Sequence, residues 1–419
     1  MTEALAATPA ALRPATQALA FHTMRYLGWA QAVKAELITR TPSNATLDAL
    51  VTVAIALLKP TDAASKAAMI DFATAAMPAY APYTVVDQAV QAADGRADLF
   101  PFKGLINGSL RRFLRERQEI ERHIGRNAEA KWNHPQWWVD LVRNTYPQQW
   151  EAILAGAQTG APLSLRVNVR QASRDQVLEA FAQAEVQASA VGETGIVLAR
   201  PRPVTQLPGF REGWWSVQDM GAQTAAPLLA VTDGMRVLDA CSAPGGKAAH
   251  LLELADIELL ALDADAARLA RVGENLDRLG LNSDKVSLQA ADAADLDAWW
   301  DGKPFDAVLA DVPCTASGIV RRHPDIRWLR RQEDVARTAR LQRTILDSLW
   351  KTVAPGGSLL YVTCSIFPAE GVRLALDFER RHQDAVRKEA PGQMLPVTDP
   401  TAPEHDRDGF FYALFAKRA

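Results

Sequence analysis

Two of the three cysteines of this chain lie in similar sequence settings, one in DVPCTASG and the other in YVTCSIFPAE. Cys314 and Cys364 each follow a short apolar run that is typical of a β-strand, and proline or polar neighbours indicate turns that open to solvent. Because a thiolate is a strong nucleophile, thiols in such turns indicate covalent chemistry. Cys241 also follows an apolar run, and we interpret its thiol as a small apolar group of the core.

A zinc site is the alternative interpretation of the three cysteines. They show no C-x-x-C spacing, and only His323 lies near one of them in the sequence. This support is weak, so we expect no metal ion.

The segment LDACSAPGGK lies between an expected strand and an expected helix, and its small residues would let a ligand approach backbone N–H groups. It matches neither G-x-G-x-x-G nor G-x-x-x-x-G-K-[ST], so nucleotide phosphates are not indicated. Asp263 ends the next strand, where an acid can bind both ribose hydroxyls, and Asp292 ends the third, beside an expected adenine. Generic loop aspartates would explain either acid alone, but less readily both in order. An adenosine without phosphate indicates S-adenosyl-L-methionine as the cofactor.

Thiols beside a methyl donor fit methylation of cytosine at C5. A thiolate that adds to C6 turns the ring into an enamine whose C5 can attack a sulfonium methyl group, and loss of the C5 proton then releases the thiolate. A second thiol would serve acid–base steps, and Asp311 is placed to hydrogen-bond the ring N3 and amino group. Spacing does not decide which cysteine attacks.

Strands and helices alternate from Trp214 onward, which predicts a Rossmann-like, doubly wound α/β domain over residues 214–419. The expected strands are MRVLDA, IELLALD, KVSLQAAD, FDAVLADVPC and GSLLYVTCS. Right-handed crossovers make such a sheet parallel and bring the carboxyl ends of its strands to one edge, where ligands bind. All three cysteines are therefore expected at this edge.

The rest of the chain divides into two parts. Apolar residues at helical spacing predict an all-α domain over residues 1–144, whose last clear helix begins near Pro101 and ends near Gly125. A small α+β domain is expected over residues 145–213, with a strand in LSLRVNVR, a helix capped by Ser173 and a strand in GIVLAR. The arginines of the 101–125 helix fit an RNA-facing edge as well as they fit a solvated helix face.

Composition sets the class of protein. The chain has 419 residues, 48% of them apolar, with a formal net charge of −3, so any nucleic-acid surface must be local. Three cysteines indicate a reducing compartment, and we expect the cytoplasm. Neither a secretory leader nor a membrane span is indicated by the sequence.

The motifs DACSAPGGK, DVPCTASGIVRRHPDIRWLRR and YVTCSIFPAE, with the terminal DGFFYALFAKR, resemble the RNA cytosine-C5 methyltransferases. PFKGLINGSLRRFLRER and HPQWWVDLVRNTYP are similar to the bacterial 16S rRNA branch, which has a NusB-like N-terminal domain. The resemblance covers nearly the whole chain. Ala248 and Gly371 stand where the family commonly has threonine and asparagine, and neither change removes a group that the chemistry requires.

The resemblance implies roles for particular residues. It makes Cys364 the nucleophile and Cys314 the group that assists release of the covalent intermediate, with Asp311 and Lys247 completing the catalytic set. The implied donor-binding residues are Cys241, Ser242, Ala243, Pro244, Gly245, Gly246, Lys247, Asp263, Arg268, Asp292 and Asp311. The expected RNA-binding residues are Arg111, Arg112, Arg115, Arg321 and Arg322.

The resemblance implies an enzyme that methylates ribosomal RNA of the small subunit, and we expect a monomer. The alternative is a non-catalytic RNA-binding or ribosome-assembly factor that retains a methyltransferase fold, but such a factor has no need for two thiols. A methyltransferase acting on a protein or a small molecule is disfavoured by the paired thiols and the local basic segments.

Overall fold

The computed structural model describes residues 5–40, 43–59, 79–398 and 405–419. The chain forms two compact units, and a short insert from the C-terminal half of the sequence joins the first of them. Residues 1–161 and 320–330 make up the first unit, and residues 162–319 and 331–419 make up the second. The predicted boundaries at 144 and 213 differ from this division, and the three-domain scheme 1–144, 145–213 and 214–419 remains a proposal.

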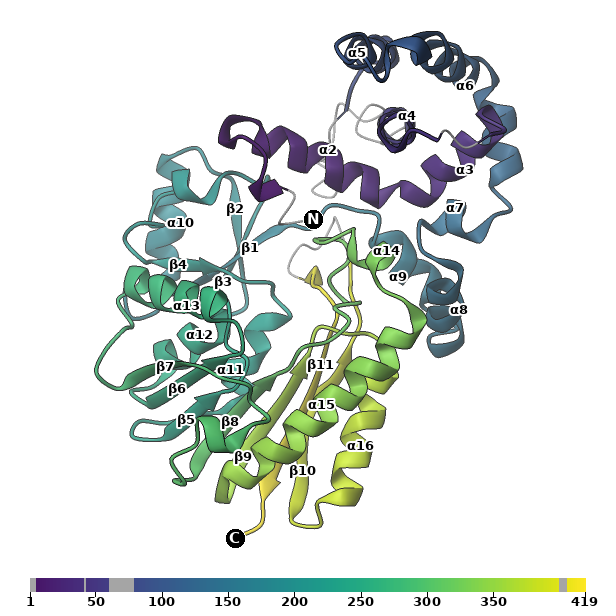
Figure 1. Cartoon of the computed structure of the whole chain (residues 1–419). Coiled ribbons are helices and arrows are strands. Elements are labelled where there is room, and N and C mark those ends of the chain that lie inside the picture. Colours follow the sequence, from purple (N-terminus) through teal and green to yellow (C-terminus); the bar gives the residue numbers. More distant parts are fainter. Residues whose placement is uncertain (1–4, 41–42, 60–78, 399–404) are drawn as a thin grey trace. The chain divides into compact units, whose positions relative to one another are not determined.

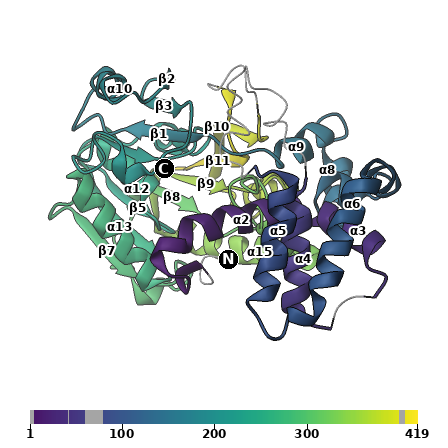
Figure 2. The ribbon, with the colours of Figure 1, turned by 90° about the horizontal axis from the view of Figure 1, so that it is seen from above.

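The first unit is helical, as the sequence predicts. Its helices are α2 (Arg13–Arg25), α3 (Leu27–Leu37), α4 (Ala45–Leu57), α5 (Pro82–Asp94), α6 (Lys103–Ile124), α7 (Ala128–Trp132), α8 (Gln136–Thr145) and α9 (Trp150–Gly156). Figure 2 shows α3, α4, α5 and α6 gathered into one bundle, and these helices share a core. Within α6, Ile106, Leu110 and Phe113 recur at three- and four-residue spacing and are fully buried.

The insert 320–330 contributes the short helix α14 (Ile326–Leu329) to this helical unit. The guanidinium group of Arg327 is fully buried and donates to the carbonyl oxygens of Asn133 at 3.2 Å and Ala157 at 2.7 Å. Trp328 donates from its indole nitrogen to the carbonyl oxygen of Met24 at 2.7 Å. The insert is therefore held by directional hydrogen bonds to backbone carbonyls.

A small antiparallel sheet begins the second unit. It has the strand order β2-β3-β1-β4 and comprises β1 (Leu163–Val167), β2 (Ala188–Val191), β3 (Gly195–Leu198) and β4 (Trp215–Val217). Helix α10 (Arg174–Gln183) is capped by Ser173, whose hydroxyl accepts from the backbone N–H of Gln176, as predicted. Because β4 pairs with β1, this sheet extends beyond residue 213 to Val217.

A seven-stranded sheet forms the rest of the second unit, in the order β10-β11-β9-β8-β5-β6-β7. Its strands are β5 (Arg236–Asp239), β6 (Glu258–Asp263), β7 (Val286–Ala290), β8 (Phe305–Asp311), β9 (Val353–Thr363), β10 (Ala385–Met394) and β11 (Phe410–Lys417). Strands β5 to β9 are parallel, as predicted, but β10 and β11 run antiparallel to their neighbours. The sheet is therefore mixed and mostly parallel, which corrects the expectation of a parallel sheet.

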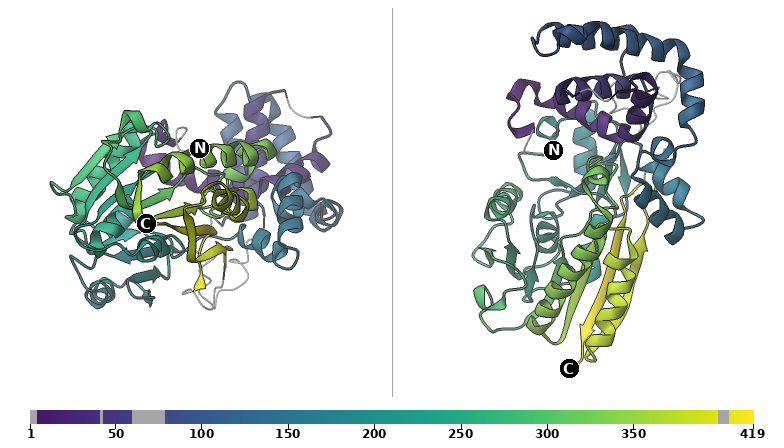
Figure 3. Two further views of the ribbon diagram at one scale, coloured as in Figure 1. Left: turned by 90° about the horizontal axis from the view of Figure 1, so that it is seen from below. Right: turned by 45° about the vertical axis from the view of Figure 1, so that its right-hand side comes forward.

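Helices cover both faces of this sheet (Figure 1). Side chains alternate along each strand, so Val237 packs on the core with α11 (Ala225–Leu229), α12 (Gly246–Leu254) and α13 (Ala266–Leu279), while Leu238 packs on the opposite core. That second core contains residues of α15 (Gln332–Thr352) and α16 (Val372–Arg381), which lie side by side along the sheet in Figure 3. The two-sided burial explains why the parallel strands read as continuous apolar runs.

A buried ion pair joins the small sheet to the large one. Arg166 of β1 and Glu253 of α12 are 0% and 1% exposed, and their side chains meet in two hydrogen bonds of 2.6 and 2.8 Å. Arg166 also donates to the carbonyl oxygen of Gly246 at 2.8 Å. The small sheet is thus tied to the first turn of α12.

Candidate active site

The carboxyl ends of the parallel strands carry most of the predicted site residues. Strands β5, β6 and β8 end at Asp239, Asp263 and Asp311, and β9 ends one residue before Cys364. Parallel pairing places these ends along one edge of the sheet. The residues that the sequence assigned to one edge are therefore brought together by the structure.

The two thiols of Cys314 and Cys364 are in contact. Their Sγ atoms are 3.3 Å apart, and the backbone N–H of Ala316 donates to Cys314 Sγ at 3.4 Å. The hydrogen bond with Cys364, together with burial, raises the pKa of the Cys314 thiol well above its ordinary value. Cys314 therefore retains its proton at neutral pH and can act as a proton donor to a neighbouring group.

Cys241 has a different environment. Burial and the carboxylate charges of Asp239 and Asp311 raise the pKa of its thiol far above the ordinary value. The thiol is therefore protonated at neutral pH, and Cys241 as an apolar packing residue remains our interpretation.

The loop after β5 turns sharply into α12. Gly245 has φ +93°, a conformation that side chains disfavour, and a Cβ at this position would lie 3.0 Å from Val272 Cγ1. Residues 241–245 precede α12, which begins at Gly246, as the motif predicted. Glycine is therefore required at position 245 for the chain to bring its backbone N–H groups to this edge.

Lys247 and Asp311 form an ion pair of 2.5 Å beside the thiols. Burial opposes the charge of Lys247, but the attraction of the Asp311 carboxylate and the hydrogen bond to it keep the Lys247 pKa above its ordinary value. A cation is thus fixed at the edge of the sheet, where it can stabilise a nearby thiolate.

Asp239 is a candidate that the sequence analysis missed. Its side chain is 1% exposed, and among the described residues neither carboxyl oxygen has a hydrogen-bond partner. Burial and the charge of Asp311 raise the pKa of Asp239 to about 7. The signal in the sequence was its position, since it ends β5 as Asp263 ends β6.

The other expected donor-binding residues surround the same loop. Asp263 is buried and accepts from the backbone N–H groups of Ala243 at 3.1 Å and Asp265 at 3.0 Å. Arg268 donates to the carbonyl oxygen of Ala243 at 3.0 Å and lies 3.7 Å from Asp263. Asp292 is exposed and accepts from the N–H of Ala294. Asp263 and Arg268 thus brace the loop that contains Ala243.

The predicted RNA-binding arginines have three different environments. Arg111, Arg112 and Arg115 are exposed on α6, where Arg111 bonds to Asn107 and Arg112 pairs with Glu116 at 2.7 Å. Arg322 is partly buried, and Arg321 is only 2% exposed. Burial of the Arg321 guanidinium argues against contact with a phosphate.

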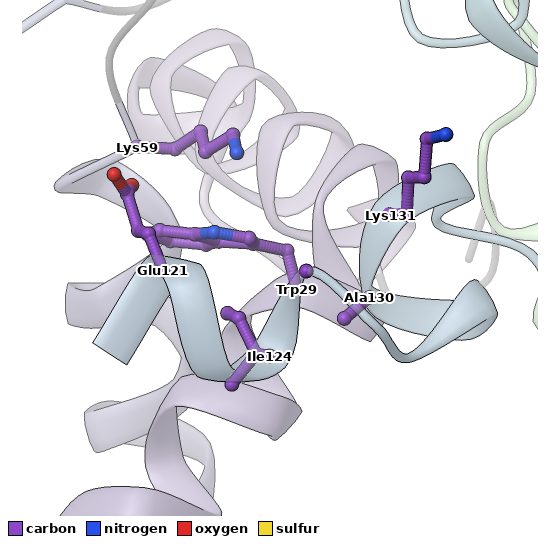
Figure 4. A pocket seen from close by; sticks show the side chains of 7 residues that line it. Trp29, Lys59, Glu121, Ile124, Ala130 and Lys131 are labelled. Carbon is purple, nitrogen blue, oxygen red and sulfur yellow. The ribbon is translucent and has the colours of Figure 1, made fainter. Parts of the chain in front are cut away.

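Two concave features of the helical unit are lined in part by charged side chains. A groove of about 780 Å³ between α5 and α6 is lined by Arg111, Lys103 and Tyr83, whose side chain is 78% exposed. A pocket of about 360 Å³ is lined by Trp29, Lys59 and Glu121, and Lys59 Nζ lies 4.5 Å from the Trp29 ring centroid (Figure 4). Only the groove contains a residue that the sequence assigned to RNA.

The described residues support neither a metal site nor a membrane-spanning helix. Among residues 5–40, 43–59, 79–398 and 405–419, no group of three or more His, Cys, Asp or Glu side chains is arranged to hold a metal ion. No helix in those same ranges is both long and apolar enough to cross a bilayer.

The strand order, the loop after β5 and the acids that end successive strands define an S-adenosyl-L-methionine-dependent methyltransferase of class I. The residues present fit this donor, because the buried carboxyl group of Asp239 lacks a partner among the described residues and would suit an ammonium group. The family model described as "16S rRNA methyltransferase RsmB/F" matches residues 226–416. A second family model, for the ferredoxin-like domain of RsmF/B-like methyltransferases, matches residues 134–205.

Curated relatives extend the match over most of the chain. Ribosomal RNA small subunit methyltransferase B of Vibrio vulnificus is 42% identical over 325 residues, which cover 76% of this chain and 74% of the relative. The protein of the same name from Pseudomonas putida is 45% identical with the same coverage. The chain therefore belongs to the RsmB/F family of 16S rRNA methyltransferases.

Solved structures agree with the fold. PH0851 is 25% identical with a TM-score of 0.77, covering 98% of this chain and 91% of that chain. NSun6 from Pyrococcus horikoshii with SFG is 18% identical with a TM-score of 0.60, covering 68% of this chain and 98% of that chain. The second likeness supports the fold alone.

Proposed function

We propose that this protein methylates C5 of a cytosine in 16S rRNA through a covalent adduct between Cys364 and C6 of the base. The observation that carries the proposal is the contact of 3.3 Å between the Sγ atoms of Cys314 and Cys364, at the edge of the sheet that also carries the donor loop. A non-catalytic assembly factor would gain nothing from two thiols in contact beside a fixed lysine–aspartate pair.

Cys364 attacks first in this mechanism. Its thiolate forms a bond to C6, and electron density moves to C5, which becomes nucleophilic. Lys247, at the end of the donor loop and paired with Asp311, supplies a positive charge that favours the thiolate. Asp311 is placed to hydrogen-bond the ring N3 and amino group as the ring gains charge.

S-adenosyl-L-methionine, when bound, supplies an electrophilic methyl group on a sulfonium sulfur. Residues 241–247 and Asp263 would hold this donor, with Arg268 bracing the loop. We further propose that Asp239 binds its ammonium group, because a buried carboxyl group without a partner is costly and a cation would offset that cost.

Release of the product requires transfer of the C5 proton to a base, a role open to solvent water, while the C5–C6 double bond forms again and the Cys364 sulfur leaves. Cys314 lies against Cys364, and its raised pKa keeps a proton available for the leaving sulfur. The contact suits either thiol for either role, and the family resemblance makes Cys314 the acid–base partner and Cys364 the nucleophile.

The substrate base must leave its stack to reach this edge, so we expect a single-stranded or flipped cytosine. We propose that Arg111, Arg112, Arg115 and Arg322 contact RNA phosphates, and that exposed Tyr83 in the groove between α5 and α6 stacks on a base. We also propose that the protein is a monomer in the cytoplasm, since the site is built from one chain with free cysteines.

Substitution of each cysteine tests the mechanism. Cys364→Ala should abolish methyl transfer to 16S rRNA, whereas Cys314→Ala should accumulate an RNA–protein adduct that survives a denaturing gel. Cys241→Ser is the matched control and should form no adduct. An adduct in Cys364→Ala instead would reverse the roles of the two thiols, and the absence of methylation by the wild type would contradict the proposed function.

A further inference from the structure

The contact between the two thiols depends on two separate loops. Cys314 lies in the turn after β8, and Cys364 lies in the turn after β9, so backbone pairing of these strands ends just before either thiol. Side chains in turns are more mobile than those in strands unless other groups hold them. The loops are joined beyond Cys314 by hydrogen bonds from the N–H of Gly318 to the carbonyl oxygen of Cys364 and from the N–H of Ile366 to the hydroxyl of Ser317, both 2.9 Å. The 3.3 Å contact also needs a link at the immediate neighbours of the two cysteines.

Glu370 provides this link from the short turn Pro368–Glu370, and its side chain is fully buried. One carboxylate oxygen accepts from the backbone N–H of Thr315 at 2.8 Å, next to Cys314. The other accepts from the hydroxyl of Ser365 at 2.7 Å, next to Cys364, and also from the hydroxyl of Thr315 at 2.5 Å. A single carboxylate thus binds the residues that immediately follow both cysteines.

Glu370 is itself held through its carboxylate by α15 and through its backbone carbonyl by the sheet. Gln342 of α15 donates from its amide to Glu370 at 3.2 Å and to the carbonyl oxygen of Pro313 at 2.9 Å. The hydroxyl of Tyr361 in β9 donates to the backbone carbonyl of Glu370 at 2.6 Å. Gln342 and Tyr361 are fully buried, so rigid elements fix the position of the link.

The chemistry of a carboxylate suits this position. An ionised carboxylate only accepts hydrogen bonds, and four donors from three residues converge on its two oxygens. Hydrogen bonds to a charged acceptor are stronger than those between neutral groups. Replacement by an apolar side chain would leave several buried donors without their acceptor, whereas glutamine keeps one carbonyl oxygen.

We propose that Glu370 is a positioning residue that holds the thiols of Cys314 and Cys364 in register for adduct formation and release. Glu370 acts through Thr315 and Ser365 and needs no contact with the base. The proposal rests on the proposed function for its catalytic consequence. Its geometric claim concerns only the separation of two thiols, which can be measured without RNA or methyl donor.

The test compares Glu370→Met and Glu370→Gln with the matched control Glu274→Gln, which alters an exposed glutamate on α13. Diamide, an oxidant that converts two adjacent thiols into a disulfide and is itself reduced to a hydrazine, traps the Cys314–Cys364 pair in the full chain. Peptide mapping gives the rate of cross-linking. Methyl transfer to 16S rRNA gives kcat and KM, and equilibrium dialysis gives donor affinity.

We expect Glu370→Met to lower kcat about 100-fold, the loss that a misplacement of about 1 Å produces, and to slow cross-linking at least about tenfold. Donor affinity should stay within about threefold, because Glu370 has no contact with residues 241–247 among its recorded hydrogen bonds. Glu370→Gln should recover part of both rates, since its amide oxygen can accept from Thr315 and the two hydroxyl groups can rotate to accept from its amide.

Thr315→Val provides a second variant that retains the carboxylate and removes only the hydroxyl link, in case Glu370→Met does not fold. It should slow cross-linking by a smaller factor, and its effect should be reduced in the Glu370→Gln background. Unchanged cross-linking in Glu370→Met and Thr315→Val would overturn the positioning role, as would a parallel loss of donor affinity and thermal stability. Failure of the cysteine variants described above would instead refute the mechanism while leaving the cross-linking result valid.

Discussion

Replacement of Asp239 by Asn should stabilise the donor-free protein and weaken donor binding at the same time. Asp239 is 1% exposed, and its carboxyl pKa is raised from 3.8 to about 7, chiefly by burial and then by the charge of Asp311. A carboxyl group that is held unpartnered in the folded state opposes folding whenever it must be charged. Asparagine removes that charge and keeps the size of the side chain.

The sign and size of the effect follow from proton linkage. Below pH 3.8 both the folded and the unfolded chain carry the proton on Asp239. Between pH 3.8 and about 7 the unfolded chain loses it while the folded chain keeps it, so the free energy of unfolding falls as pH rises. At about 1.4 kcal/mol per pH unit, the loss reaches about 4 kcal/mol above pH 7.

Urea denaturation of Asp239→Asn and of the wild type, without donor, measures this directly. The variant's advantage should be about 1.5 kcal/mol at pH 5 and about 4 kcal/mol at pH 8. Asp284→Asn, at an exposed position, should show no such trend. If the difference between Asp239→Asn and wild type did not change with pH, burial of the charge would not be the cause. If the variant bound S-adenosyl-L-methionine as tightly as the wild type, Asp239 would not bind its ammonium group.

Three further substitutions test other parts of the structure. Arg166→Met should lower the free energy of unfolding by about 3–5 kcal/mol, because it leaves the buried Glu253 carboxylate without its partner, and denaturant titration would show this against the exposed control Arg271→Met. Gly318→Ala should slow methyl transfer, since a Cβ there would collide with the carbonyl oxygen of Gly409, whereas Gly104→Ala, with no heavy atom within 4 Å, should leave the rate unchanged. Arg327→Met should make the insert 320–330 more sensitive to trypsin, because it removes hydrogen bonds to the carbonyl oxygens of Asn133 and Ala157. Equal cleavage rates in the wild type and the variant would show that these bonds do not hold the insert.

The sequence predicted the central strands β5, β6, β8 and β9, whose neighbours lie on both sides in the sheet, and also the edge strand β7. Continuous apolar runs such as FDAVLADVPC became β8, because helices cover both sides of the central strands. It missed the adjacent strands β10 and β11 at one end of the sheet and the short strands β2 and β4. β10 lies at the end of the sheet order and reads AVRKEAPGQM, where charges and a proline hide the strand, as edge strands often do.

For the site, the sequence predicted which residues would lie close together but not the hydrogen-bond partners of each side chain. Cys314 and Cys364 were expected at one edge because both follow strands, and the structure places their sulfur atoms in contact. The arginines after Cys314 were read as either a solvated face or a phosphate-binding surface. Arg327 is neither, since it is buried among backbone carbonyls, and a sequence does not reveal such acceptors because every residue carries one.

The path of the chain through the insert limits how this protein can be divided. The polypeptide leaves the methyltransferase unit after Ile319, five residues beyond Cys314, contributes residues 320–330 to the helical unit and returns at Arg331. A fragment that starts at Pro162 would keep every residue proposed for catalysis and donor binding, yet Arg327 and Trp328 would lose their acceptors at Asn133, Ala157 and Met24. The helical unit is therefore not a removable appendage, and exchanging it between relatives would require exchanging residues 320–330 with it.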